Sequence, residues 1–419
     1  MPTGTFGCVS VRGERVTFEG GSGQLLAGRL DLPAGPPTAY ALFAHCFTCG
    51  KDAHAASRIA AELSDLGLGV LRFDFTGLGD SSGDFENTDF TSNVDDLVAA
   101  ADWLRSHHRA PQVLVGHSLG GAAALVAAPR IAGVRAVATI GAPSSTEHLA
   151  TLLTTVLADS HAAISNDGVT SARLGDRTFA VGPAFVDDLA RHQVLAAAAA
   201  LDAALLLLHS PTDNVVGIDH AAAVYGAARH PKSFVALDGA DHLLSDRADA
   251  AYAARVIGTW AARYVRDESG AAPLPRATAP VVVAETTQGR YLNHVVVGAH
   301  RFLADEPVGV GGFDAGPSPY DLLGAALGAC TSMTLRMYAE RKELEIGRIT
   351  VEVTHDHVHA DDAPAAGVSG DARIDRFRRV LHVDGNLDEA VRARMLEIAD
   401  RCPVHRTLER SSHIETRLA

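Results

Sequence analysis

The sequence predicts an α/β protein with two domains, and three observations support this prediction. The chain has 419 residues, a length that suits two or three domains. Four short apolar runs in its first part are typical of buried strands because each leads into a turn: residues 39–44, 113–115, 204–209 and 234–237. Residues 267–280 contain three prolines and little to bury, so we expect a semi-extended linker there. The expected domains are residues 1–266 and residues 281–419.

The strongest motif is the pentapeptide Gly116-His117-Ser118-Leu119-Gly120, which has the pattern G-x-S-x-G. The apolar run at residues 113–115 precedes it, and small apolar residues suited to a closely packed helix follow it. A strand that turns sharply into a helix holds a serine hydroxyl up at the turn, and flanking glycines leave room for it. A glycine-rich turn with an ordinary surface serine would explain the pentapeptide alone. Because a strand and a helix flank it, we predict that Ser118 is a nucleophile.

Two further residues complete a predicted catalytic triad. The run at residues 204–209 leads into a turn that contains Asp213, and the run at residues 234–237 is soon followed by His242. Open α/β sheets place their sites at the carboxyl ends of their strands, where each of these residues lies. A serine nucleophile needs a base, and the base needs an orienting carboxylate. We therefore predict that Ser118, Asp213 and His242 act together, in the order typical of α/β-hydrolases.

The loop after residues 39–44 is the predicted source of one oxyanion-hole donor. The expected donors are the backbone N–H groups of Phe47 and of Leu119, the residue after the nucleophile. This loop also contains Cys46 and Cys49 in a C-x-x-C pattern. Such spacing fits a redox switch on the loop, although two small packing residues would explain it as well.

Residues 15–265 resemble an α/β-hydrolase of the compact esterase or acyl-peptidase type. The resemblance rests on residues 45–47, the turn at residues 74–79, the pentapeptide, Asp213 and His242. It implies an α/β-hydrolase fold and a serine hydrolase that cleaves acyl (carboxyl) esters. Thioesterases and peptidases use the same triad, so these alternatives stay open. Residues 144–200 form an insertion long enough to be a small cap, which we expect to select the substrate.

The composition argues against some binding partners and some cellular locations. The formal net charge of −14 argues against nucleic acid and against an anionic membrane surface, because both need a basic face. The most apolar stretch, residues 194–208, is interrupted by Asp202 and is too short to span a bilayer. Residues 1–10 lack the pattern of a secretory signal, and five cysteines do not suggest a disulfide framework. We expect a cytoplasmic protein.

The second domain carries two cysteines of interest. Residues 281–283 and 295–297 predict a hairpin, and Ser318 is the expected N-cap of a helix that continues to Leu335. This helix is apolar nearly all round, so we expect it to be buried on every side, with Cys330 in its middle. A free cysteine in such a place is more often an inert core residue than a nucleophile. Cys402 continues the apolar stripe of a later helix, which Pro403 is expected to end, so it continues that helix's buried face and could meet Cys330. The sequence leaves open whether the two approach closely enough for a disulfide.

Residues 319–323, Cys330 and the pair Cys402-Pro403 resemble the OsmC family of osmotically inducible and organic hydroperoxide resistance proteins. The resemblance covers nearly all of residues 281–419 and implies an α+β domain. It implies that Cys330 reacts with an organic hydroperoxide, that Cys402 resolves the sulfenic acid as a disulfide, and that a dithiol reductant restores both thiols. It also implies a homodimer. The alternative is a single-activity hydrolase whose second domain is a non-catalytic dimerisation module.

The charges expected beside a reactive thiol differ from the OsmC pattern. Where family members often carry a glutamate, ten positions before the cysteine, this chain has Tyr320, followed by Asp321. Nine helical steps place Asp321 on the opposite helix face and ~13 Å from Cys330 along the axis. A capping box with Ser318 is the alternative role for Asp321. Arg290 is the first candidate for the cation that activates Cys330, and Arg301 is the second.

Three histidines alternate near the middle of this domain. His355, His357 and His359 would point the same way on one strand, and imidazole suits zinc and copper. No cysteine lies near them in the sequence, and the acids around them indicate a solvated strand end. We therefore expect no metal and no other cofactor.

Overall fold

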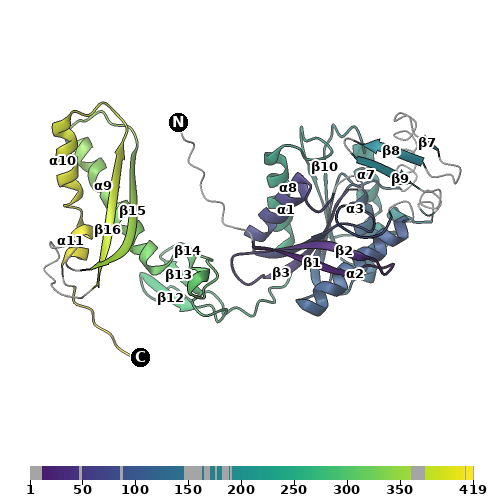
Figure 1. The fold of residues 1–419 in the computed structure, drawn as a ribbon, viewed down its shortest axis with the longest axis horizontal. Helices are drawn as coiled ribbons and strands as arrows, with labels where there is room; N and C mark the ends of the chain where they lie inside the picture. Colours follow the sequence, from purple (N-terminus) through teal and green to yellow (C-terminus); the bar gives the residue numbers. More distant parts are fainter. Residues whose placement is uncertain are drawn as a thin grey trace. The chain divides into compact units, whose positions relative to one another are not determined.

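The structure, a computed structural model, describes residues 12–46, 50–84, 88–145, 163–164, 170–174, 177–181, 188, 191–359, 373–410 and 412–418. The chain divides into two compact units, residues 1–271 and residues 272–419 (Figure 1). The division falls within residues 267–280, where we expect the linker. No helix in the described ranges is both long enough and apolar enough to cross a bilayer.

The first unit is built on an eight-stranded sheet in the order β1-β2-β4-β3-β5-β6-β10-β11 (Figure 1). The strands are β1 (Arg12–Glu19), β2 (Leu25–Leu32), β3 (Ala39–Ala44), β4 (Leu68–Phe73), β5 (Pro111–His117), β6 (Ala136–Ile140), β10 (Ala204–His209) and β11 (Lys232–Ala236). The two strands at one edge, β1 and β2, pair antiparallel, and the other six run parallel to one another. All four predicted strands of this domain are present.

Helices cover both faces of this sheet. The helices are α1 (His54–Asp65), α2 (Phe90–His107), α3 (Leu119–Ala127), α6 (Val194–Ala200), α7 (Ile218–Ala227) and α8 (Arg247–Ala261). One apolar core lies under α1 and α8, and the other lies under α2, α3, α6 and α7. Between these layers, β3, β4, β5, β6 and β10 are buried along their whole length, as parallel strands covered on both faces must be.

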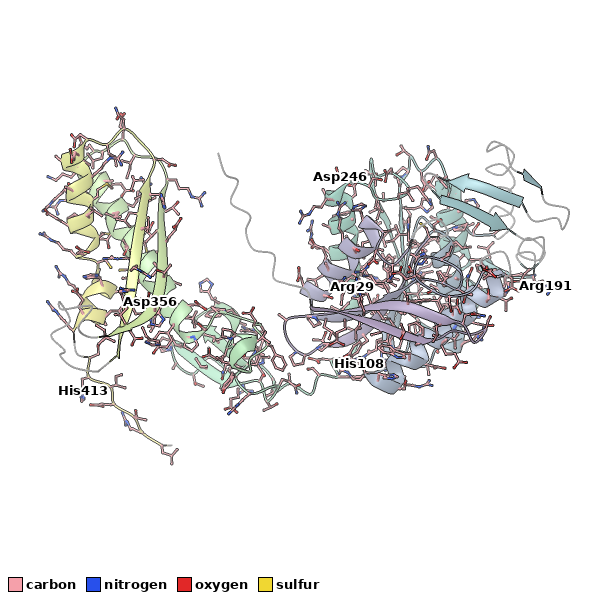
Figure 2. The ribbon with its side chains drawn as sticks, viewed as in Figure 1. Arg29, His108, Arg191, Asp246, Asp356 and His413 are labelled. Atoms are coloured by element: carbon pink, nitrogen blue, oxygen red, sulfur yellow. The ribbon has the colours of Figure 1, made fainter. Side chains whose placement is uncertain are left out.

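Side-chain caps set the beginnings of two of these helices. Asp89 and Ser92 form a capping box at the start of α2. Asp246, which is labelled in Figure 2, caps α8, because its carboxylate accepts the backbone N–H of Ala248 at 2.8 Å. Both helices therefore begin at residues that the local sequence specifies.

The insertion at residues 144–200 is described in part. It contains a small antiparallel sheet of three strands, β7 (Ala163–Ile164), β8 (Thr170–Leu174) and β9 (Arg177–Val181). Asp188 is buried, and its carboxylate accepts the backbone N–H of Thr91 at 2.7 Å. This contact anchors one end of the insertion to the first turn of α2. Residues 146–162, 165–169, 175–176, 182–187 and 189–190 lie outside the described ranges, so the role of the insertion as a cap stays a prediction.

The second unit contains two sheets and three α-helices in its described ranges. The predicted hairpin is formed by β12 (Val281–Glu285) and β13 (Asn293–Val297), with β14 (His300–Ala304) as a third strand. Next come α9 (Pro319–Arg341), the long hairpin of β15 (Ile349–His359) and β16 (Arg373–Val383), α10 (Glu389–Ala399) and α11 (Pro403–Glu409). The small core of buried Leu335, Met395 and Ala399 joins α9 to α10.

The prediction that the Cys330 helix is buried on every side is wrong for a single chain. The buried residues of α9 follow one face, and they are Gly324, Leu327, Gly328, Thr331, Leu335 and Ala339. On the other face, Met333 and Met337 are 66% and 69% exposed. The β15–β16 hairpin and α10 pack against one face only, so an apolar sequence alone did not reveal which face would stay uncovered.

Candidate active sites

Ser118 lies at the sharp turn between β5 and α3. Its backbone has φ 54° and ψ −122°, a conformation that is strained for a residue with a side chain. The turn is also crowded. A Cβ at Gly120 would lie 2.4 Å from the carbonyl oxygen of Ala44, and one at Gly116 would lie 2.3 Å from that of Gly120. Both positions therefore need glycine, and the packing that they allow holds Ser118 at the carboxyl end of β5.

The structure brings Ser118, Asp213 and His242 together. The Nε2 atom of His242 lies 3.0 Å from Ser118 Oγ, and Nδ1 lies 2.7 Å from Asp213 Oδ2. All three side chains are buried. Since the carboxylate accepts the proton on Nδ1, Nε2 is free to accept the hydroxyl proton of Ser118.

Asp213 is held by the turn that follows β10. Its Oδ1 accepts the backbone N–H groups of Val215 and Val216, each at 2.9 Å. Burial raises the pKa of Asp213, but the hydrogen bonds from His242, Val216 and Val215 outweigh burial and lower the pKa below its ordinary value. Asp213 is therefore a carboxylate at neutral pH, with both oxygens occupied.

His117, the residue before the serine, forms a hydrogen bond that helps to position the backbone of His242. Its Nε2 donates to the backbone carbonyl of His242 at 2.7 Å. Burial lowers the pKa of His117 to about 4, so the ring is neutral at physiological pH. Sequence reasoning missed this residue, because it occupies a variable position of the G-x-S-x-G pattern and its partner lies 125 residues away.

The structure describes one of the two predicted oxyanion donors, Leu119. Leu119 is the first residue of α3, so its backbone N–H has no acceptor within the helix and lies directly after Ser118. Phe47 and Cys49 lie outside the described residues. Cys46 is buried and disulfide-bonded, with its partner also outside the described residues, so it is more than a small packing residue.

A buried ion pair holds the chain just after this loop. The Asp74 carboxylate accepts the backbone N–H of Lys51 at 2.6 Å, the Lys51 Nζ at 2.8 Å and the backbone N–H of Asp80 at 2.9 Å. Burial alone would lower the pKa of Lys51, but hydrogen bonds to Asp74 and Asp80 outweigh burial and raise it to about 12. Asp74 thus ties the segment after β3 to the turn after β4.

We expect Lys51→Met to destabilise the first unit by about 3–5 kcal/mol, because it leaves the buried Asp74 carboxylate without its cation. The measurement is urea unfolding of the full chain at neutral pH. The pKa of Lys51 lies above its unfolded value of 10.5, so this stabilisation is complete below about pH 10.5 and is lost as the pH rises through about 12.

The matched control is Lys232→Met. Lys232 Nζ donates to the neutral carbonyl oxygens of Tyr225 and Ala228, at 2.6 and 2.8 Å. Its removal therefore leaves no buried charged group without its partner. An equal loss of stability in both variants would contradict the role given to Lys51.

A cavity of about 720 Å³ lies beside the triad. The residues that border it include Phe43, Lys51, Arg58, His117 and Leu243. Ser118 and His242 are not among its described lining residues, although their neighbours His117 and Leu243 are. The cavity therefore lies on the side of the sheet that α1 covers, and among its described lining residues it reaches the chain neighbours of Ser118 and His242 only.

The second unit places Cys330 and Cys402 on neighbouring elements, both as free thiols. Cys330 is partly buried in α9, whereas Cys402 is fully buried and is the N-cap of α11. The Cys402 sulfur accepts the backbone N–H of His405 at 3.3 Å and lies 3.6 Å from Oγ1 of Thr331. The residue next to Cys330 in the chain therefore contacts Cys402. Pro403, expected to end a helix, begins α11 instead.

Arg379 is the cation that the structure places near this pair, and sequence reasoning missed it. Its Nη1 donates to Thr331 Oγ1 at 2.9 Å, and its Nη2 donates to Asp400 at 2.8 Å. A signal was present, because Arg379 alternates with the apolar residues Phe377 and Leu381 on the face of β16 that α9 covers.

The residues predicted to activate the thiol lie elsewhere in one chain. Arg290 is exposed after β12, with its guanidinium 5.2 Å from the centre of the Tyr291 ring, and Arg301 is exposed in β14. Asp321 forms the capping box with Ser318, whose backbone N–H it accepts at 2.9 Å. In the described part of one chain, none of the three is hydrogen-bonded to Cys330. Their activating roles remain predictions.

Comparisons with known proteins agree with this division of the chain. Residues 41–255 match the family model described as alpha/beta hydrolase family, and residues 312–417 match the OsmC-like protein model. None of the curated proteins compared with the chain matches it.

Several solved structures are similar to the first unit. The esterase domain of a Rhodothermus marinus protein is 46% identical, with 60% of this chain and 99% of that chain covered and a TM-score of 0.51. Est1E of Butyrivibrio proteoclasticus with bound ferulic acid is 17% identical, with 59% and 99% covered and a TM-score of 0.48. A Pyrococcus furiosus esterase is 16% identical, with 63% and 96% covered and a TM-score of 0.49.

The hydrolase match spans more than half of the chain, and it includes Ser118, Asp213 and His242. The chain therefore belongs to the alpha/beta hydrolase family, and an OsmC-like domain follows its hydrolase domain.

Proposed function

We propose that the first unit is a serine hydrolase that cleaves carboxyl esters. The observation that carries this proposal is the position of His242, which contacts both Ser118 Oγ and the ionised Asp213. The 46% identity to a domain described as an esterase supports an ester substrate.

Each residue has a distinct task in the proposed mechanism. Ser118 Oγ attacks the ester carbonyl while His242 Nε2 takes its proton, and Asp213 stabilises the imidazolium that forms. The backbone N–H groups of Leu119 and Phe47 donate to the oxyanion. His242 then returns the proton to the leaving alcohol, and water releases the acyl group from Ser118 by the reverse sequence.

The substrate class is tested with matched acyl groups on three leaving groups. We expect the full chain to hydrolyse p-nitrophenyl esters of short acids much faster than the corresponding thioesters or aminoacyl-anilides. A preference for anilides would instead identify a peptidase with the same triad.

We propose that the second unit reduces organic hydroperoxides through Cys330 and Cys402. The Cys330 thiolate attacks one peroxide oxygen, which releases an alcohol and leaves a sulfenic acid. Cys402 attacks the sulfenic sulfur and releases water, and a dithiol then reduces the resulting disulfide. The contact between Thr331 and the buried Cys402 sulfur supports this pairing, as does the OsmC-like match. The dithiol that this cycle needs is supplied in the cytoplasm, which we propose as its compartment, although the Cys46 disulfide is unusual there.

One equivalent of cumene hydroperoxide is expected to convert Cys330 and Cys402 into a disulfide, which mass spectrometry detects. In Cys402→Ser the same treatment should stop at a sulfenic acid, and a further equivalent of hydroperoxide should over-oxidise it, because the resolving thiol is absent. Arg290→Ala should slow the first step, with Arg301→Ala as its comparison. If both thiols of the unaltered protein stay free in excess peroxide, the second unit is a scaffold without peroxidase activity.

We also propose that the chain forms a homodimer through residues 281–419. The exposed Met333 and Met337 lie on a face of α9 that is expected to be buried by a second copy. Light scattering should give a dimeric mass for the full chain. A monomeric full chain at micromolar concentration would contradict this assembly.

A further inference from the structure

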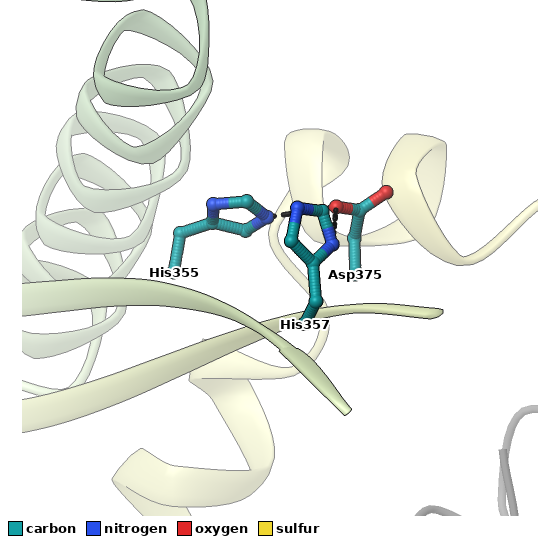
Figure 3. A group of neighbouring side chains, drawn as sticks. All are labelled: His355, His357 and Asp375. Carbon is teal, nitrogen blue, oxygen red and sulfur yellow. Dashed lines mark hydrogen bonds and ion pairs between the residues drawn. The ribbon is translucent and has the colours of Figure 1, made fainter. Parts of the chain in front are cut away.

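We propose that the β15–β16 hairpin binds one divalent transition-metal ion between His355, His357 and Asp375 (Figure 3). These residues take no part in either proposed activity. The site is assembled from both strands of the hairpin, and its carboxylate comes from the strand that follows the histidines.

The register of the hairpin puts the three side chains on one face. His357 lies opposite Asp375 across the two strands, and His355 lies opposite Phe377. Alternate residues of a strand project to the same side, so His355 and His357 share a face with Asp375 and Phe377. In the sequence Asp375 lies 18 residues beyond His357, so spacing along the chain does not connect it with the histidines.

The spacing of the ligand atoms fits one ion. His355 Nε2 lies 2.8 Å from Asp375 Oδ1, His357 Nδ1 lies 3.1 Å from the same oxygen, and the ligand atoms all lie within 4.8 Å of one another. Two ligands of a tetrahedral ion, with bonds of about 2.1 Å, lie roughly 3.4 Å apart, which falls within this range of separations. Figure 3 shows both imidazole rings directed at the carboxylate. Small side-chain movements would therefore complete the site.

One ligand is held in place by aromatic contacts. The His355 ring stacks on Tyr320 of α9, with centroids 4.3 Å apart and planes at 6°, and it lies 4.7 Å from the Phe377 ring. The His355 side chain is 18% exposed, whereas His357 and Asp375 are 53% and 45% exposed. An ion would therefore have one ordered ligand on the protein side and open positions for water on the other.

Two nearby arginines are paired away from the three candidate ligands. Arg376 and Arg378 flank this part of β16 but alternate with Asp375, so they project to the opposite face. There they pair with Asp356, at 2.8 and 2.7 Å. Two imidazoles and one carboxylate suit Zn²⁺ and its neighbours in the first transition row, whereas Ca²⁺ and Mg²⁺ prefer oxygen ligands.

The test is calorimetric titration of Zn²⁺ into the untagged, chelator-treated full chain. We expect one ion per chain at this site, with a dissociation constant in the micromolar range or below. Asp375→Asn keeps the shape of the side chain, and His357→Ala removes an exposed ring, so both variants should fold. Each should weaken this binding at least tenfold. Thermal melting in the presence of chelator verifies that they fold.

The matched control is His382→Ala. His382 lies on the same hairpin, on the opposite face, and is 54% exposed, nearly the same as His357. Its removal should leave the affinity unchanged. Co²⁺ distinguishes this site from the cysteines, because thiolate ligation would produce a sulfur-to-cobalt charge-transfer band. Unchanged binding in His357→Ala, equal loss in His382→Ala, or a thiolate band would each overturn the proposal.

Discussion

Replacing Ser118 with alanine is expected to lower kcat for ester hydrolysis about a million-fold, the usual loss when a triad serine is removed. The hydroxyl is the only group of this triad that forms a bond to the substrate in the proposed mechanism. Without it, His242 has no proton to take. A residual rate about 10³–10⁴ above that in water should persist, because the oxyanion donors and the binding surface remain.

The second unit supplies the control for this experiment. Ser118 and Cys330 belong to different compact units, so Ser118→Ala should leave hydroperoxide reduction intact. Cys330→Ser should do the reverse, abolishing peroxide reduction while ester hydrolysis continues. Ester hydrolysis at the original rate in purified Ser118→Ala would remove this serine from the mechanism.

Asp213→Asn is expected to lower kcat about 10⁴-fold with little change in the position of the imidazole. The asparagine amide would present N–H donors to His242 Nδ1, which would then have to accept a hydrogen bond. The ring proton would move to Nε2, and the nitrogen that faces Ser118 could no longer take its proton. Steady-state kinetics on a p-nitrophenyl ester measures the effect.

The same substitution at Asp238 is the matched control. Asp238 also follows a strand and lies four residues before His242, but it is exposed. Asp238→Asn should keep nearly full activity. Equal losses in the two variants, or a loss below tenfold in Asp213→Asn, would show that Asp213 does not orient the base.

The fold of the first unit and its three central residues could be predicted from the sequence because each has a local signature. The strands β3, β5 and β10 are apolar at nearly every position, and Gly116 and Gly120 flank the turn at Ser118. Asp213 and His242 each follow a strand, so the sheet brings them to the edge where Ser118 lies. No long-range contact had to be inferred.

The remaining contacts depend on partners that are distant in the sequence. Asp74 meets Lys51 across two loops, and Arg379 meets Thr331 only when β16 and α9 have packed. Asp375 reaches the histidines through the register of a hairpin. Spacing within one segment carries no information on such pairs. The wrong prediction that α9 is buried on every side has a related cause. The apolar sequence of a helix does not show whether residues of its own chain or of a second chain cover each face.

The left-handed backbone at Ser118 also creates a conflict between catalysis and stability. A side chain in such a conformation costs about 1–3 kcal/mol, which glycine would avoid. A chain selected for folding stability alone would therefore have glycine at this position. Serine at this position lowers the already marginal free energy of unfolding, but it places a hydroxyl where the reaction needs it. Screens for heat-resistant variants of this domain should consequently be coupled to an activity assay, because stability by itself rewards the loss of the nucleophile.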